Sequence, residues 1–210
     1  MKILIITGPF GSGKTTVSNY AAATLRSKGT AVKIVALDEV SRAVINESQA
    51  LRSDLAEAFG DHILNDDTSL NRPALAELAF ADDKATAKLN ALVHPPTIIA
   101  ARRLVDAALD AEELPIVETP FPAMYCADLF DHSEDEIPVQ NIIWTVFADK
   151  ETRLERGLAD GFCLDDAQQR MARQPRMSAY QSEADLSIEN MDSLSDLRLE
   201  VKMAIEESGL

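Results

Sequence analysis

The sequence is poor in cysteine and in basic residues and has no long uncharged run, and each scarcity excludes a class of protein. The two cysteines, Cys126 and Cys163, provide neither a disulfide framework nor the closely spaced pairs of a zinc site. No stretch without charged residues approaches the roughly 20 residues that a membrane-spanning helix needs. The 20 Lys and Arg residues stand against 35 Asp and Glu, so the formal net charge of the 210 residues is −15. That charge disfavours nucleic acid and anionic membranes as partners, and we expect a soluble cytoplasmic protein, a monomer or small homo-oligomer.

Acidic residues are missing altogether from the first 37 positions, although these positions contain several basic residues. The acidic excess therefore lies entirely in the rest of the chain. A cationic segment in an acidic protein suits the binding of a small anion, although a short window can also show such a bias by chance.

Short apolar runs alternate with amphipathic stretches along the chain. The runs at 2–6, 31–37, 115–119, 141–147 and 185–188 have the length and composition of buried strands. Helices are predicted between and after them, at 14–27, 39–47, 53–59, 71–80, 84–93, 97–113, 149–159, 165–174 and 193–208. This alternation indicates an α/β fold with a five-stranded parallel sheet flanked by helices.

Residues 39–113 contain several predicted helices and no strand, which is more than one crossover needs, so we interpret them as a helical insertion. Within it, His94-Pro95-Pro96 is expected to separate two helices, because proline in a helix interior removes a hydrogen bond. The acidic run at 131–136 is expected to be a solvated loop.

The sequence GPFGSGKT at residues 8–15 satisfies the phosphate-loop pattern GxxxxGK[ST], and it lies between the first predicted strand and a helix. Glycines let the backbone N–H groups of such a loop surround phosphate oxygens, and the helix N-terminus adds partial positive charge. We expect Lys14 to reach the β- and γ-phosphates and the Thr15 hydroxyl to ligate Mg²⁺. Further loop contacts are expected from Gly11, Ser12, Gly13 and Thr16. The motif therefore implies ATP or GTP together with Mg²⁺.

The rest of the sequence favours a small-molecule kinase over other phosphate-loop proteins. The chain has no NKxD signature of a GTPase, and the strand at 141–147 ends in Ala148 and Asp149, a poor match to the acid of a motor ATPase. Asp38, in contrast, directly follows the second predicted strand. A carboxylate there can orient an acceptor hydroxyl and take its proton. The alternative is that Asp38 caps the helix expected to begin at residue 39.

An ordered series of motifs resembles the dephospho-coenzyme A kinase family over nearly the whole chain. The family's GxGSGK[ST]T loop corresponds to residues 10–16, and its DADxIAR segment corresponds to residues 36–42, matching at Asp38 and Arg42. Its insertion pattern corresponds to Phe59-Gly60, Arg72, Leu75, Phe80, Leu89-Asn90 and His94-Pro95. Glu118-Thr119-Pro120 resembles the end of its third strand, and its later segments correspond to Arg156, Arg170, Gln174, Asp185 and Asn190.

This resemblance implies a P-loop kinase fold formed by residues 1–210, with an acceptor-binding helical insertion at 39–113 and a short lid at 160–181. The implied reaction is ATP-dependent phosphorylation of the 3′-hydroxyl of dephospho-coenzyme A, the last step of coenzyme A synthesis. The implied catalytic residues are Asp38 as the base, Lys14 and Arg42. Nucleotide contacts are implied for Arg156, Arg170 and Asn190, and contacts to the acceptor for Arg42, Arg72, His94 and Glu118.

The chain also departs from the family pattern. Ala36 replaces the first Asp of DADxIAR, Met124 lies in a segment that lacks the usual Glu, and Ala159 and Tyr180 stand where the lid has cations. Arg170, Arg173 and Arg176 recur every three residues and are candidates to replace those cations, or else form a solvated helix face. Two of the acceptor-site candidates have a structural alternative. Arg72 can be a surface cation at a helix start, and His94 can be a histidine that caps the preceding helix. Two other functions stay open: a nucleoside or nucleotide kinase, and a noncatalytic ATP-binding switch.

Overall fold

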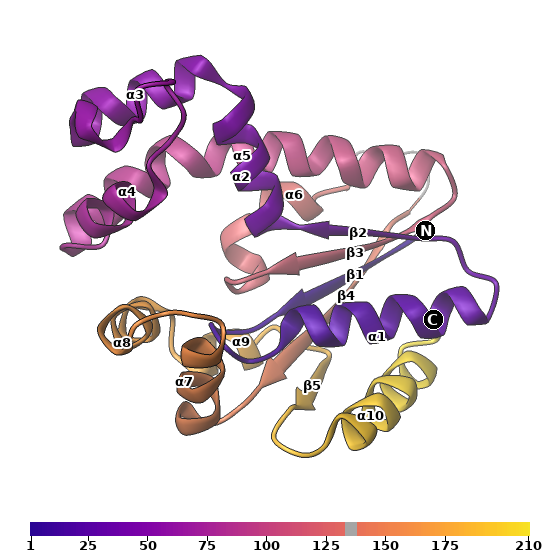
Figure 1. Cartoon of the computed structure of the whole chain (residues 1–210). Coiled ribbons are helices and arrows are strands. Elements are labelled where there is room, and N and C mark those ends of the chain that lie inside the picture. Colours follow the sequence, from indigo (N-terminus) through magenta and orange to yellow (C-terminus); the bar gives the residue numbers. More distant parts are fainter. Residues whose placement is uncertain (133–137) are drawn as a thin grey trace. The chain divides into compact units, whose positions relative to one another are not determined.

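A computed structural model describes residues 1–132 and 138–210, so part of the acidic loop expected at 131–136 lies outside the described residues (Figure 1). Five parallel strands form one sheet in the order β2-β3-β1-β4-β5. They are β1 (Lys2–Thr7), β2 (Val32–Ala36), β3 (Leu114–Thr119), β4 (Gln140–Phe147) and β5 (Leu186–Glu189). The predicted five-stranded parallel sheet is confirmed, and the predicted strands match the observed ones to within two residues at each end.

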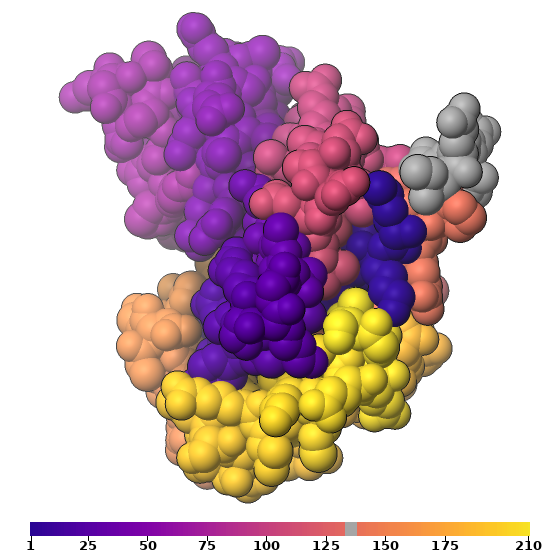
Figure 2. Space-filling model, turned by 90° about the vertical axis from the view of Figure 1, so that its right-hand side faces the viewer, coloured from indigo at the N-terminus to yellow at the C-terminus, as the bar shows by residue number. Residues whose placement is uncertain are grey.

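Helices cover both faces of the sheet. Helices α1 (Lys14–Ser27) and α10 (Leu194–Glu207) pack side by side on one face, where their apolar residues join those of the central strands in one core (Figures 1 and 2). On the other face lie α6 (Ala127–Phe130) and the last turns of α5 (Asp83–Asp110). The central strand β1 is almost free of exposed side chains, with Ile3, Leu4, Ile5 and Ile6 buried. This burial on both faces explains its continuous apolar sequence.

Two compact units divide the chain. The first contains the sheet and consists of Met1–Ala36 and Arg103–Leu210, and the second is Leu37–Arg102. The second unit contains α2 (Leu37–Glu47), α3 (Gln49–Phe59), the short 3-10 helix η1 (Asp61–Ile63), α4 (Arg72–Ala79) and the first part of α5. It has an apolar core of its own, formed by residues that include Ile45, Leu55, Ile63, Leu75 and Val93. The region predicted as a helical insertion thus corresponds largely to a unit that packs around a separate core.

The prediction of two helices separated at His94-Pro95-Pro96 is wrong, because α5 continues through both prolines. A proline inside a helix costs about 3 kcal/mol, so flanking interactions must compensate. Val93 and Thr97 are buried in the helix on either side of the prolines, and the Thr97 hydroxyl donates to the Val93 carbonyl at 2.7 Å. Tertiary packing therefore overrides the local break.

Three helices follow β4 within the sheet unit: α7 (Lys150–Ala159), α8 (Leu164–Arg173) and α9 (Met177–Gln181). The first two begin with side-chain caps, because Asp149 accepts from the Thr152 amide at 2.8 Å and the Cys163 sulfur accepts from the Asp166 amide at 3.4 Å. The short helix η2 (Ala123–Cys126) and helix α9 were not predicted. Among the described residues, no helix has the length and apolarity needed to cross a membrane, and no group of three or more His, Cys, Asp or Glu residues is arranged to hold a metal ion.

Candidate active site

The phosphate loop connects β1 to α1 and requires glycine at its turning points. Gly11 and Gly13 have φ angles of 73° and 91°, in the left-handed region that favours glycine. A Cβ atom at Gly11 would collide with the backbone of Arg153, and one at Gly13 would collide with the amide of Asn190. These contacts fix the loop against α7 and against the end of β5.

Inside the loop, polar groups are arranged as a phosphate ligand would need them. Ser12 is completely buried, yet its hydroxyl has no hydrogen-bond partner among residues 1–132 and 138–210. Lys14 is also buried, and its ammonium group donates to the Pro9 carbonyl at 3.1 Å. A buried hydroxyl without a partner costs free energy, and a phosphate oxygen would satisfy it. The loop therefore fits the phosphate groups of a nucleotide.

Glu118, near the end of β3, holds the first turn of α1. Its carboxylate accepts from the Thr15 hydroxyl at 2.7 Å and lies 3.4 Å from the Ser18 hydroxyl. Glu118 and Ser18 are buried, and β3 is hydrogen-bonded directly to β1. Hydroxyl and carboxylate oxygens are the ligands that Mg²⁺ prefers, so Thr15 and Glu118 fit a magnesium ion bound beside the loop.

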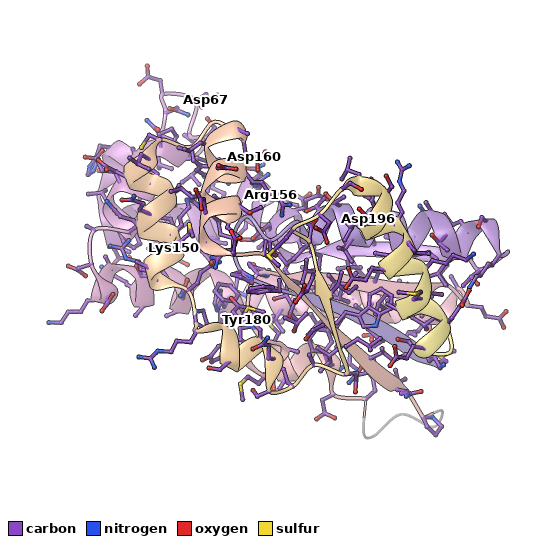
Figure 3. All side chains as sticks on the ribbon, turned by 90° about the horizontal axis from the view of Figure 1, so that it is seen from below. Asp67, Lys150, Arg156, Asp160, Tyr180 and Asp196 are labelled. Carbon is purple, nitrogen blue, oxygen red and sulfur yellow. The ribbon has the colours of Figure 1, made fainter. Side chains whose placement is uncertain are left out.

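Arg156 and Asn190 hold the loop from the opposite side. The Arg156 guanidinium lies 3.4 Å and 3.3 Å from the carbonyls of Gly11 and Ser12, and it donates to the Asn190 carbonyl at 2.8 Å. The buried Asn190 amide also donates to the Ser12 carbonyl, at 2.8 Å. Figure 3 shows Arg156 on α7. Both residues were predicted as nucleotide contacts, and the structure brings both directly to the loop.

A second anchor is formed by Arg153, which the sequence analysis overlooked, and by Gln174, which it matched to the family pattern without giving it a role. The Gln174 side-chain oxygen accepts from the Phe10 amide at 2.8 Å and from Arg153 at 3.2 Å. Arg153 also donates to the Phe10 carbonyl at 2.7 Å, and burial lowers the pKa of its guanidinium from the ordinary value. The spacing of Arg153 and Arg156 on one helix was the available signal, because residues three apart share a helix face.

The arginines of the predicted lid differ in their surroundings. Arg170 lies over the Phe162 ring, 4.8 Å from its centroid, and Phe162 packs edge-on against Phe10 of the loop at 5.1 Å. Arg173, the last residue of α8, has a buried guanidinium nitrogen, whereas Arg176 is exposed. The three arginines therefore do not form a single solvated helix face: Arg176 is exposed, whereas Arg170 contacts an aromatic ring and Arg173 is partly buried.

The segment after β3 is held by α9 and by the residues that follow it. Tyr180 is completely buried, and its hydroxyl donates to the Pro120 carbonyl at 2.8 Å (Figure 3). The Glu183 carboxylate accepts from the amides of Ala123 and, at 2.9 Å, Met124. Tyr180 therefore stabilises the segment after β3. Met124 in that segment points to solvent, with 59% of its surface exposed.

The remaining predicted residues belong to the unit Leu37–Arg102. Asp38 follows β2 by two residues and is exposed in the first turn of α2, which begins at Leu37. The expectation of a helix start at residue 39 with Asp38 as its cap is therefore wrong, because Asp38 already lies inside the helix. Arg42 is exposed one turn further along α2.

Arg72 and His94 are placed within the same unit. Arg72, at the start of α4, donates to the Asn46 side chain at 2.9 Å and lies 3.5 Å from the Arg42 carbonyl. His94 lies inside α5 and is half-buried, and burial lowers the pKa of its imidazole. The alternative that His94 caps a preceding helix is wrong, because the helix does not end there.

Comparison with known proteins gives a consistent assignment. A family described as dephospho-CoA kinase matches residues 2–196. The dephospho-CoA kinase of Corynebacterium glutamicum is 32% identical over 204 residues, covering 96% of this chain and 94% of the relative. The dephospho-CoA kinase of Geobacter sulfurreducens is 30% identical over 203 residues, covering 96% of both chains.

Solved structures agree in fold. The crystal structure of TT1252 from Thermus thermophilus has a TM-score of 0.65 and 28% identity, covering 98% of this chain and 97% of that one. At 16% identity, an APS kinase of Mycobacterium tuberculosis shares the fold, with a TM-score of 0.56 and coverage of 98% and 97%. Together with the loop and the five-stranded sheet, these matches place the chain in the dephospho-CoA kinase family.

Proposed function

We propose that this protein transfers the γ-phosphoryl group of ATP to the 3′-hydroxyl of dephospho-coenzyme A. The observation that carries the proposal is the family match over residues 2–196, which includes both the phosphate loop and the unit Leu37–Arg102. The loop geometry supports the nucleotide half of the reaction, since the buried Ser12 hydroxyl and the Lys14 ammonium group suit phosphate oxygens.

In the proposed reaction, the ribose 3′-oxygen forms a bond to the γ-phosphorus while the bond from that phosphorus to the β,γ-bridging oxygen breaks. ADP leaves, and the hydroxyl proton passes to the Asp38 carboxylate, which is exposed and follows the end of β2. Lys14 and the loop amides stabilise the charge that develops on the transferring group. Arg42, one turn after Asp38, is proposed to orient the acceptor.

Thr15 and Glu118 are proposed to hold Mg²⁺, whose charge would neutralise the phosphate oxygens when the ion is bound. Their 2.7 Å hydrogen bond supports this role, because it gathers two oxygen donors at the start of α1. Glu118 was predicted as an acceptor contact, and its observed partners Thr15 and Ser18 favour the metal instead. Arg156, Asn190 and Arg170 are proposed to complete the nucleotide site.

The unit Leu37–Arg102 is proposed to bind the acceptor. Dephospho-coenzyme A carries a diphosphate, and Arg72 is an exposed cation that Asn46 holds beside the backbone of α2. A guanidinium in a fixed orientation suits a diphosphate. His94 is proposed as a neutral contact, since burial lowers the pKa of its imidazole.

The test is a phosphoryl-transfer assay with ATP and Mg²⁺ that compares dephospho-coenzyme A with a panel of nucleosides and nucleotides. We expect turnover with dephospho-coenzyme A and a loss of about 100-fold or more in kcat for Asp38→Asn, with ATP affinity retained. Glu39→Gln, the exposed neighbour, is the matched control and should retain turnover. Turnover confined to nucleosides or nucleotides would support the alternative kinase. Normal ATP binding without turnover on any acceptor would support a noncatalytic switch.

A further inference from the structure

Arg72 is oriented by two neutral groups of α2, although the chain is rich in carboxylates. Its Nη2 atom donates to the side-chain oxygen of Asn46 at 2.9 Å and lies 3.5 Å from the Arg42 carbonyl. In the part of the chain that the structure describes, no carboxylate pairs with Arg72, and its Nε and Nη1 atoms have no hydrogen-bond partner. Neutral partners fix the direction of a guanidinium without neutralising its charge. The charge and the N–H groups of Nε and Nη1 therefore remain for a ligand.

Asn46 shares a face of α2 with the two residues proposed for the reaction. Asp38, Arg42 and Asn46 are spaced four residues apart, and all three are exposed. Residues four apart are neighbours on a helix surface, so the three form one row about 12 Å long. The contacts of Arg72 place its guanidinium beside the second half of that row. In dephospho-coenzyme A one ribose carries the 3′-hydroxyl on C3′ and the diphosphate on C5′, so one acceptor molecule can meet both ends of the row.

The backbone of Asn46 is itself fixed at the end of α2. Arg52 of α3 donates to the Ile45 carbonyl at 2.9 Å and to the Asn46 carbonyl. Carbonyls in the last turn of a helix have no partner inside the helix, so these bonds stabilise its end. Arg52 also donates to the Thr68 carbonyl at 3.1 Å, in the loop that precedes α4 and Arg72. One arginine thus joins the two segments from which Asn46 and Arg72 extend.

We propose that Asn46 is a positioning residue that holds Arg72 in the orientation needed to bind the diphosphate of the acceptor. The proposal rests on the proposed function, in which Arg72 contacts that diphosphate. Both side chains are exposed, so their hydrogen bond contributes little to folding, and its value lies in restricting the guanidinium before the acceptor binds. A carboxylate at this position would also hold Arg72, but it would neutralise the charge and repel the diphosphate. The amide of Asn46 therefore favours an anionic acceptor.

The experiment compares Asn46→Ala with the parent protein. We expect the KM for dephospho-coenzyme A, and its dissociation constant measured by calorimetry, to rise about tenfold, because a preorganised charged donor is lost. Both kcat and the KM for ATP should stay within about twofold, since the contact is equal in the ground state and the transition state. Asn46→Gln keeps an amide oxygen and should recover part of the affinity. Gln49→Ala, which removes an exposed amide at the start of α3, should match the parent.

A double-mutant cycle separates this role from a direct contact between Asn46 and the acceptor. Arg72→Gln should weaken acceptor binding more than Asn46→Ala does. Adding Asn46→Ala to Arg72→Gln should then change the affinity by less than about twofold, because the two residues act as a unit. Asn46→Asp should weaken acceptor binding at least as much as Asn46→Ala. It should also flatten the dependence of the KM on ionic strength, because the charge of Arg72 is neutralised.

The same measurements can overturn the proposal. Parental acceptor affinity in Asn46→Ala would show that Arg72 needs no support, and in Asn46→Asp it would show that the charge of Arg72 is not used. Additive losses in the cycle would show that Asn46 acts without Arg72. Equal losses of kcat, ATP affinity and thermal stability would show a general packing role. The proposed function has a separate readout: a parent protein inactive on dephospho-coenzyme A would overturn that function and this inference with it, whereas an active parent isolates Asn46.

Discussion

At the scale of the residue, Glu118 shows how one carboxylate can join a strand to the phosphate loop. Its two oxygens contact the hydroxyls of Thr15 and Ser18, so it fixes the first turn of α1 where a magnesium ion would bind. A buried carboxylate is costly unless it is paired or hydrogen-bonded, and the two hydroxyl donors reduce that cost.

We expect Glu118→Gln to weaken the use of magnesium more than the binding of nucleotide. The substitution removes the negative charge while keeping the shape and a possible hydrogen bond to Thr15. kcat at fixed Mg²⁺ should fall by about 100-fold, and the Mg²⁺ concentration for half-maximal rate should rise, because a metal-binding charge is missing. Turnover titrated with Mg²⁺ measures both. An unchanged Mg²⁺ dependence would contradict the assignment. Glu113→Gln, at the residue just before β3, provides the control.

Tyr180 gives a prediction about stability. Its buried hydroxyl donates to the Pro120 carbonyl at 2.8 Å, and burial raises its pKa above the ordinary value of 10.0. Tyr180→Phe should lower the free energy of unfolding by about 1–2 kcal/mol at neutral pH, because the carbonyl loses a donor. Urea denaturation of Tyr180→Phe and of the exposed Tyr125→Phe measures the difference.

The raised pKa of Tyr180 also predicts how the free energy of unfolding changes with pH. Above pH 10.0 the unfolded chain releases the phenolic proton while the folded protein retains it, so the unfolded state is favoured. Stability that is complete below that pH should therefore be lost as pH rises further, more steeply in the parent than in Tyr180→Phe. Parallel alkaline profiles for the two proteins would contradict this account.

At the scale of the element, the turn that follows α5 contains a strained residue. Glu112 has a φ of 57°, and its amide bonds to the Leu109 carbonyl while the Glu113 amide bonds to the Ala108 carbonyl. This arrangement closes a helix with a left-handed residue, a position where glycine is usual because other residues pay a steric cost. The helix therefore ends in a favourable motif with an unfavourable residue.

Glu112→Gly should raise the free energy of unfolding by about 0.5–1 kcal/mol, since relief of strain exceeds the added chain entropy of glycine. Urea denaturation with an unchanged m-value is the measurement. Glu113→Gly is the matched control, because Glu113 is not among the residues with positive φ, and it should destabilise. A destabilised Glu112→Gly variant would contradict the strain argument.

Elements were easier to predict than contacts. The strands and most helices follow from apolar runs and caps. Helix α5 was predicted as two helices, because tertiary packing keeps it continuous through Pro95 and Pro96. The phosphate loop could be located from its motif, because its glycines encode its shape. The pairing of Thr15 with Glu118 could not be predicted, because it depends on β3 lying beside β1. The contacts of Arg153 and Gln174 likewise join segments far apart in the sequence.

At the scale of the whole molecule, the chain consists of two units with separate apolar cores. The proposed nucleotide contacts lie in the sheet unit, and the proposed acceptor contacts Asp38, Arg42, Arg72 and His94 lie on α2, α4 and α5 of the helical unit. A unit with its own core can open locally without unfolding the rest. Binding of the acceptor and stability of the sheet are thus expected to be separable.

Leu55→Ala tests this separation, because Leu55 is completely buried in the core of the helical unit. The cavity should cost about 2–4 kcal/mol. Hydrogen exchange should accelerate mainly in α3, α4 and the first turns of α5, with smaller changes in β1 and β4. Val201→Ala, in the sheet core, should produce the opposite distribution. Equal acceleration in both units after Leu55→Ala would show one cooperative structure instead.

The central claim is that this chain directs the 3′-hydroxyl of dephospho-coenzyme A at a nucleotide held by the phosphate loop. A crystal structure with dephospho-coenzyme A, Mg²⁺ and a nonhydrolysable ATP analogue tests it most directly. The account predicts the 3′-oxygen within about 2.6–3.2 Å of the Asp38 carboxylate, with the γ-phosphate of the analogue at Lys14. A complex in which the acceptor is bound with its 3′-oxygen facing away from both Asp38 and the γ-phosphate would contradict the claim.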